Sequence, residues 1–290
     1  GASRRQFGVP IEKLPAVSDM IIDMKIAIEA GRSLLYETSK IVDMEIAYAR
    51  QLEQNKDADK ARKKELKALS RKYKRQAAMF TPMSKYYCSE MCNDVTYDAI
   101  QVLGGSGFMR DYPTERYARD ARITTIYEGT SQLQVVAAVR GVCSGTAMKW
   151  ITEYQQKEYS KEVQDLLELL AEGSEQISKA ITFIKEKGNE YMDLHGRSLV
   201  DAAIDIINGY LLCSQASSPY DMEISVPDPA NPDPANRDGK MSMRKRKEIV
   251  ARRYITRNAP GIRAMSEKIC SGDVSSFENY KALAGIVPEL

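Results

Sequence analysis

The sequence has 290 residues, 43% of them hydrophobic and 28% charged, and its 42 Lys or Arg against 40 Asp or Glu leave a net charge of +2. A net charge this close to zero does not steer the whole molecule toward nucleic acid. No run approaches the 18 apolar residues of a membrane span and no signal-peptide core is present, so we expect a cytoplasmic protein without a membrane span.

Five cysteines and one histidine restrict the possible metal and hydrolase chemistry. An odd number of cysteines without framework spacing fits reduced thiols. Cys88 and Cys92 lie four residues apart and could share a helix face. Because His195 is the only histidine, we interpret the two cysteines as buried side chains and not as zinc ligands. His195 would have to be the base of any Ser-His-Asp or Cys-His hydrolase, and no nucleophile motif accompanies it. We therefore predict no metal site and no hydrolase.

The first residues, GASRRQFGVPI, read in isolation as a charged tail. From residue 17 to about residue 54, apolar side chains recur at helical spacing. This pattern predicts one helix about 54 Å long, at about 1.5 Å per residue. Gly31 lies inside it, at a position that suits close packing of a second helix.

Residues 56–75 (KDADKARKKELKALSRKYKR) carry ten Lys or Arg against three acids. One interpretation is a site for nucleic acid or for the phosphates of coenzyme A. The other is a solvated helix start, which we favour because no aromatic platform flanks the charges and Leu66 and Tyr73 fall on one helical edge. Thr81-Pro82 then predicts a fresh helix start, as N-cap and first helical residue, with the helix running to Leu103.

Residues 101–140 contain two breaks separated by a short predicted helix. The first break is GGSG (104–107), whose glycines permit positive φ and a close approach of the backbone to a ligand. A glycine helix stop explains Gly104 but not three glycines together. No Lys-Ser/Thr follows, so this is not a Walker loop. Residues 112–122 predict a helix whose alternating charges we expect to pair and to fix the following loop.

The second break is Tyr127-Glu128-Gly129-Thr130, directly before a helical pattern that Thr130 or Ser131 is placed to cap. We therefore expect Glu128 at a loop end and not on a solvated face. A carboxylate held beside an aromatic ring and away from water has a raised pKa, as a general base working near neutral pH requires. The alternative is an exposed loop acid, which is the commoner fate of a glutamate.

Residues 101–140 closely resemble the C-terminal signature of the flavin-dependent acyl-CoA dehydrogenases, in which Q-x-x-GG-x-G is followed by YP-x-E-x-x-x-RDA and then I-YEGT-x-Q. The opening segment resembles the R-x-Q-F-G-x-P-I that begins the C-terminal helical domain of that family. The resemblance implies α,β-dehydrogenation of an acyl-CoA thioester. It implies Glu128 as the base that removes the α-proton, FAD as the hydride acceptor, and an electron-transfer flavoprotein as the oxidant of reduced FAD.

The resemblance also implies the binding residues and the assembly. Tyr127 and Gly129 flank the base at the substrate, and flavin contacts across a subunit boundary imply a homo-oligomer, either a dimer or a tetramer. One departure from the family is Leu14-Pro15, where some members carry His-Gln as further flavin contacts. The residues implied to contact FAD are Arg4, Gln6, Phe7, Gln101, Gly105, Thr130 and Gln132.

Full-length family members place a helical domain and a β-domain before this region, and no strand-rich stretch appears here. We expect the chain to be a C-terminal piece, excised or one half of a split gene, and inactive alone. Beyond Arg140, residues 163–187 and 191–216 predict helices, 218–239 a proline-rich loop, and 241–270 a helix broken near 259–261. This part resembles the extra C-terminal domain of the longer members.

We therefore predict an all-α protein of two domains. Residues 1–145 form an antiparallel helical bundle, and residues 146–290 form a second helical domain that contains the loop 218–239. The rival hypothesis is a helical interaction module without chemistry, which binds nucleic acid through the basic segments 56–75 and 244–257.

Overall fold

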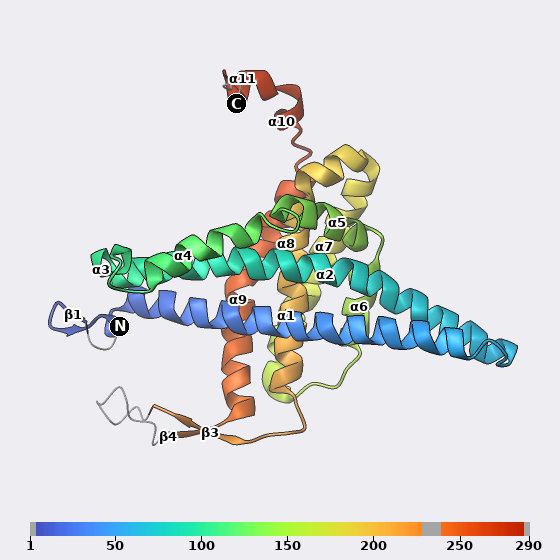
Figure 1. The fold of residues 1–290 in the computed structure, drawn as a ribbon, viewed down its shortest axis with the longest axis horizontal. Helices are drawn as coiled ribbons and strands as arrows, with labels where there is room; N and C mark the ends of the chain where they lie inside the picture. Colours follow the sequence, from blue (N-terminus) through green and yellow to red (C-terminus); the bar gives the residue numbers. More distant parts are fainter. Residues whose placement is uncertain (1–3, 228–238, 287–290) are drawn as a thin grey trace.

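The computed structural model describes residues 4–227 and 239–286, and within them the chain is helical apart from two short hairpins (Figure 1). The predicted all-α fold class is confirmed. None of the described helices is long and apolar enough to cross a bilayer. The elements are β1 (Arg5–Gln6), β2 (Val9–Pro10), η1 (Ile11–Lys13), α1 (Pro15–Gln54), α2 (Lys60–Leu103), α3 (Gly105–Phe108), α4 (Thr114–Arg122), η2 (Ile123–Thr125), α5 (Ser131–Cys143), α6 (Thr146–Gln155), η3 (Lys161–Val163), α7 (Gln164–Lys187), α8 (Asn189–Ala216), β3 (Glu223–Val226), β4 (Gly239–Ser242), α9 (Met243–Cys270), α10 (Ser275–Glu278) and α11 (Tyr280–Ala284).

Helices α1 and α2 form a long antiparallel hairpin that spans the molecule (Figure 1). The predicted first helix is confirmed as α1, where Ala30, Leu34 and Ile41 are buried on one stripe. A Cβ on Gly31 would lie 3.1 Å from the Met91 side chain of α2, so the glycine permits the close helix contact that the sequence indicated.

The helix start predicted at Thr81-Pro82 is wrong, because α2 runs through Pro82 without a break. Proline has no N–H to donate to the carbonyl four residues earlier. That carbonyl belongs to Ala78, which is exposed, so water can satisfy it. Phe80 and Met83 on either side are fully buried, and their packing keeps the helix continuous.

The break predicted near 259–261 is also wrong, because buried side chains around the proline again keep the helix continuous. Helix α9 continues through Pro260, and the carbonyl left without a partner belongs to the exposed Thr256. Tyr254, six residues before the proline, and Ile262, two residues after it, are buried and hold the helix against its neighbours.

Helices α7, α8 and α9 cross behind the α1–α2 hairpin (Figure 1), and the buried core runs from Ile26 in α1 to Ile269 in α9 without interruption. The division at 145/146 stays a prediction. Part of the predicted loop 218–239 is instead strand β3, which pairs with β4 in an antiparallel hairpin. Residues 228–238 of that loop lie outside the described part of the chain.

Candidate functional site

The N-terminal hairpin lies against the glycine turn at the end of α2 (Figure 1). The Arg4 guanidinium donates a hydrogen bond to the carbonyl of Leu103, and a Cβ on Gly104 would lie 3.1 Å from the same guanidinium. The hairpin turns at Phe7, which has φ +52° and is 84% exposed. Residues 4–7 are therefore brought to residues 101–105, although about a hundred positions separate them in the sequence.

The three glycines of GGSG meet different structural requirements. Gly104 has φ +58°, in the region that glycine adopts without a steric penalty. A Cβ on Gly107 would lie 2.8 Å from the carbonyl oxygen of Ile100, so Gly107 is needed for packing inside the chain. A Cβ on Gly105 would meet nothing within 4 Å, so its backbone faces open space. Only Gly105 leaves room for a ligand to approach the main chain.

The loop before α5 is held by Lys85, a residue that the sequence patterns did not single out. Its ammonium group donates to the carbonyls of Thr124 (2.8 Å) and Gly129 (2.9 Å) and lies 5.6 Å from the centre of the Tyr127 ring. The signal available in the sequence was a single charged residue, Lys85, in the otherwise uncharged stretch 76–89. Lys85 therefore ties both ends of the loop that carries Glu128 to the longest helix.

The other loop contacts come from the first turn of α5. Thr130 is the N-cap, and its hydroxyl accepts from the Leu133 N–H at 3.4 Å. Gln134 donates to the carbonyls of Glu128 (3.3 Å) and Gly129 (3.5 Å). Gln132, which the family resemblance singles out, is exposed and makes no hydrogen bond with its side chain to a described residue. The capping prediction for this helix is confirmed.

Glu128 lies at the loop end just before α5, as expected, but it is exposed, so the expectation that it avoids a solvated face is wrong for this chain. Tyr127 beside it is 51% exposed, and no described side chain pairs with the Glu128 carboxylate. Glu128 has φ +51°, which L-residues rarely adopt and which costs about 1–2 kcal/mol. The surrounding hydrogen bonds hold this strained backbone in place.

Helix α4 separates the glycine turn from the Glu128 loop. Its nine residues correspond to about 14 Å at about 1.5 Å per residue. The charge pairs expected within residues 112–122 are not found among the described side chains, since Arg116, Arg119 and Asp120 are exposed and make no ion pair. Of the predicted set, only Arg122 contacts the following segment, by donating to the Thr125 hydroxyl, and Lys85 and Gln134 hold the loop beyond it. The predicted site residues thus form two groups, one at each end of α4.

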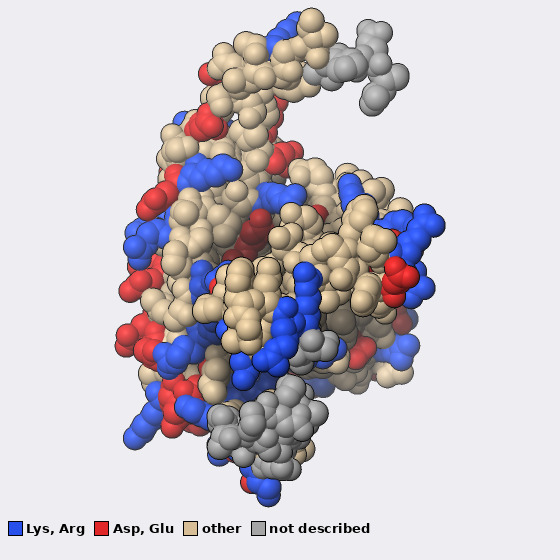
Figure 2. Space-filling view, turned by 90° about the vertical axis from the view of Figure 1, so that its left-hand side faces the viewer, with Lys and Arg blue, Asp and Glu red and all other residues tan. Residues whose placement is uncertain are grey.

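A cavity of about 360 Å³ lies between α1, α2 and α8. Tyr86 donates to Asp201 at 2.7 Å, and Tyr254 of α9 donates to Asp205 at 2.8 Å. Burial raises the pKa of both aspartates, that of Asp205 to about 7, although the tyrosine hydrogen bonds act in the opposite direction. Acidic side chains are recessed in a hollow on the face drawn in Figure 2, and elsewhere on that face the two signs of charge are intermixed.

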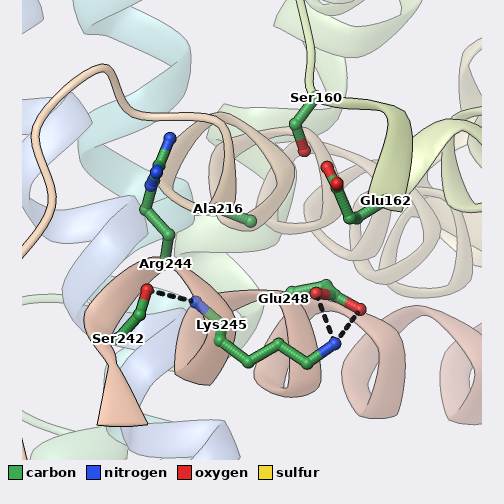
Figure 3. Close-up of a pocket in the computed structure, with 7 residues that line it drawn as sticks. All are labelled: Ser160, Glu162, Ala216, Ser242, Arg244, Lys245 and Glu248. Carbon is green, nitrogen blue, oxygen red and sulfur yellow. Dashed lines mark hydrogen bonds and ion pairs between the residues drawn. The ribbon is translucent and has the colours of Figure 1, made fainter.

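The basic segment 244–257 is neutralised by carboxylates of the same chain. Arg246 and Lys247 bind Glu29, which is only 8% exposed. Burial alone would raise the pKa of Glu29, but hydrogen bonds from these two cations lower it to about 2. Lys245 pairs with Glu248, three residues further along the first turns of α9 (Figure 3). The other pairs are Arg244–Asp221, Arg252–Asp165, Arg253–Asp19, Arg253–Asp23, Arg257–Asp19 and Arg257–Asp23.

Comparison with known proteins identifies the family of this chain. Residues 2–142 match the family model described as acyl-CoA dehydrogenase, C-terminal domain, and residues 143–224 match the one described as acyl-CoA dehydrogenase C terminal. The chain belongs to the acyl-CoA dehydrogenase family. The resemblance inferred from residues 101–140 is thereby confirmed.

Relatives in this family match about half of the chain. The caffeyl-CoA reductase-Etf complex subunit CarC of Acetobacterium woodii is 33% identical over 50% of this chain and 30% of its own length. The mitochondrial short-chain specific acyl-CoA dehydrogenase of Sus scrofa is 36% identical over 46% of this chain and 25% of its own length. The chain thus aligns with about a quarter to a third of these acyl-CoA dehydrogenase relatives.

A solved acyl-CoA dehydrogenase complexed with FAD, from Bacillus anthracis, has the same fold over 92% of this chain and 44% of its own. The TM-score is 0.60 and the sequence identity is 20%, so this likeness concerns the fold alone.

Proposed function

We propose that this chain carries the base and part of the FAD site of an acyl-CoA dehydrogenase that oxidises the Cα–Cβ bond of an acyl-CoA thioester. The observation that carries the proposal is the Glu128 loop. Lys85 and Gln134 hold it in one conformation, and it presents a carboxylate at a solvent-facing, strained position within the family's matched region.

Two features of the loop suit removal of the α-proton. The Glu128 carboxylate is free to accept a proton, because no described residue binds it. The backbone N–H of Glu128 makes no hydrogen bond within the described residues, so it can donate to the thioester carbonyl. A donor aimed at that oxygen stabilises the charge that develops as the α-proton leaves.

The glycine-turn group fits an FAD nucleotide. Gly105 has open space at its Cα, and Gln101, Gln6 and Phe7 on the two segments that Arg4 joins are exposed and can offer hydrogen-bonding and aromatic groups. Arg4 adds a positive charge at the same turn. FAD, when bound, supplies the acceptor for the hydride that leaves Cβ. Thr130 and Gln132 lie at the other end of α4 and are proposed as contacts to the nucleotide of the same or a neighbouring subunit.

Several finer points of this proposal rest on the relatives. An electron-transfer flavoprotein is the proposed oxidant, in keeping with the relative named as a subunit of an Etf complex. Self-association is proposed because the exposed Phe7 and Phe108 flank the glycine turn and a neighbouring subunit would cover them.

The purified chain gives a first test. Because Glu128 is exposed and no described residue covers it, we propose that the 290-residue chain alone does not turn over acyl-CoA. Added FAD, a series of acyl-CoA thioesters and an artificial electron acceptor should give no turnover. Turnover at the median enzyme rate of about 10 per second would contradict this part of the proposal.

The nucleic-acid hypothesis loses one of its two segments, because the cations at 244–257 are paired within the chain. No observation favours it over the dehydrogenase proposal.

A further inference from the structure

The first turns of α2 carry a row of cations with a regular spacing. Lys60, Lys64, Lys67, Arg71 and Lys74 are separated by four, three, four and three residues, and all five are exposed. Within residues 4–227 and 239–286, none of the five forms an ion pair. We call this row the α2 seam.

Residues at alternating spacings of four and three fall on one face of a helix, with the 3.5-residue period of helices that pack side by side. The seam covers about 21 Å at about 1.5 Å per residue. Leu66 is fully buried, and Tyr73 stacks on Tyr48 of α1 at 5.3 Å, so the opposite side of α2 is the one that packs on α1.

The seam lies on the part of the hairpin that reaches beyond the other helices (Figure 1). Of the cations that lie off the seam in this region, Arg62 and Lys72 pair with Glu65 and Glu153, whereas Lys63 and Arg75 form no ion pair within the described residues. No described carboxylate pairs with the seam itself, which therefore stays positive.

The same spacing continues beyond Lys74 along α2. It passes through the exposed Ala78 and Thr81 and reaches Lys85, which holds the Glu128 loop. A partner helix that extended about 16 Å beyond Lys74 would therefore reach that loop.

We propose that the α2 seam docks an acidic helix of a partner protein, one whose carboxylates repeat at the same four-three spacing. The seam matches such a helix in both charge and period. Each exposed ion pair contributes little, about 0.2–1 kcal/mol, so the contact is reversible and sensitive to salt.

Two other anionic partners suit the seam less well. The major groove of DNA, about 12 Å wide, admits a single helix, whereas α2 is backed along this length by α1. The seam positions also hold no aromatic side chain on which bases could stack. A membrane surface requires no helical period, and the five seam residues include no apolar side chain to enter a bilayer.

The proposal does not depend on the dehydrogenase activity and is tested by binding alone. The probes are a fluorescent helical peptide with glutamates at alternating four-three spacing and a scrambled peptide of identical composition. A short DNA duplex and vesicles with about 30% phosphatidylserine complete the set. Binding to the full chain is measured at about 20 mM and about 150 mM salt.

We expect the matched peptide to bind about tenfold more tightly than the scrambled peptide, and more tightly than the duplex or the vesicles. The triple variant Lys64→Gln, Lys67→Gln, Arg71→Gln should abolish the difference between the two peptides. A control variant, Lys149→Gln, Lys179→Gln, Lys268→Gln, removes three exposed cations elsewhere and should retain it.

Three results would overturn the proposal: equal binding of the two peptides, no binding of either, or tighter binding of the duplex or the vesicles. Retention of peptide selectivity in the triple variant would overturn it as well. Circular dichroism checks that both variants are folded. We expect both to fold, because all six substituted residues are exposed.

Discussion

Replacing Lys85 by methionine removes the charge that ties the Glu128 loop to α2 while keeping most of the side-chain volume. Lys85 donates to the carbonyls of Thr124 and Gly129, which lie on either side of Glu128. Without these bonds, we expect the loop to open more often and Glu128 to leave its positive-φ conformation.

The size of the effect follows from the contacts. A hydrogen bond to a charged group contributes about 1.5–3 kcal/mol, and the cation over the Tyr127 ring contributes about 0.5–1 kcal/mol. Lys85 is half-buried, and water can reach the freed carbonyls, so we take the lower values. The two hydrogen bonds and the cation contact then give about 3.5 kcal/mol, and hydration of the freed carbonyls lowers the expected cost in the free energy of loop opening to about 2–3 kcal/mol.

Hydrogen exchange of the amides of Ile126 and Tyr127 measures this opening, because both donate to the carbonyl of Ile123. A loss of about 2 kcal/mol corresponds to about a 30-fold fall in protection. Lys74→Met on the exposed face of the same helix is the matched control and should change neither amide. Protection within about twofold of the wild type in Lys85→Met would refute the clamp.

Three further predictions concern stability. Glu29→Gln should lower the free energy of unfolding by about 2–3 kcal/mol at pH 7, because Arg246 loses its partner. With a folded pKa of about 2 against 4.5, Glu29 contributes fully above about pH 4.5 and loses its contribution as the pH falls toward 2, as urea titrations at several pH values will show. Asp205 has a pKa of about 7 in the folded protein against 3.8 in the unfolded chain. Between about pH 4 and pH 7 the folded protein therefore keeps a proton that the unfolded chain has released. The free energy of unfolding falls by about 1.4 kcal/mol for each unit by which the pH rises in this range. Asp205→Asn should flatten that slope, and an unchanged slope would contradict the assignment. Gly107→Ala should cost about 1–3 kcal/mol by thermal melting, whereas Gly105→Ala, with open space for its Cβ, should melt within about 2 °C of the wild type.

The patterns that the sequence predicted correctly are local ones. Helix α1 follows from a single buried stripe, and the Thr130 cap follows from its position before an apolar run. The start expected at Pro82 was wrong because local propensity cannot report the packing of Phe80 and Met83, which keeps the helix intact.

The contacts that the sequence could not predict join distant segments. Lys85 reaches a loop about forty positions away, and Glu29 meets Arg246 across 217 positions. Neither residue stands in a motif, and one sequence does not reveal which charges meet after folding. The exposure of Glu128 was also missed, because the aromatic residue beside it does not cover it.

The central claim is that Glu128 is the base of an acyl-CoA dehydrogenase. A chimera in which this chain replaces the matching C-terminal part of the Bacillus anthracis relative tests it most directly, with and without Glu128→Gln. Turnover of acyl-CoA with an artificial electron acceptor should be present in the parent chimera and should fall by about 10²–10⁴-fold in the variant, while both bind FAD equally. Equal turnover by the two chimeras, or an FAD-bound parent chimera without turnover, would contradict the account.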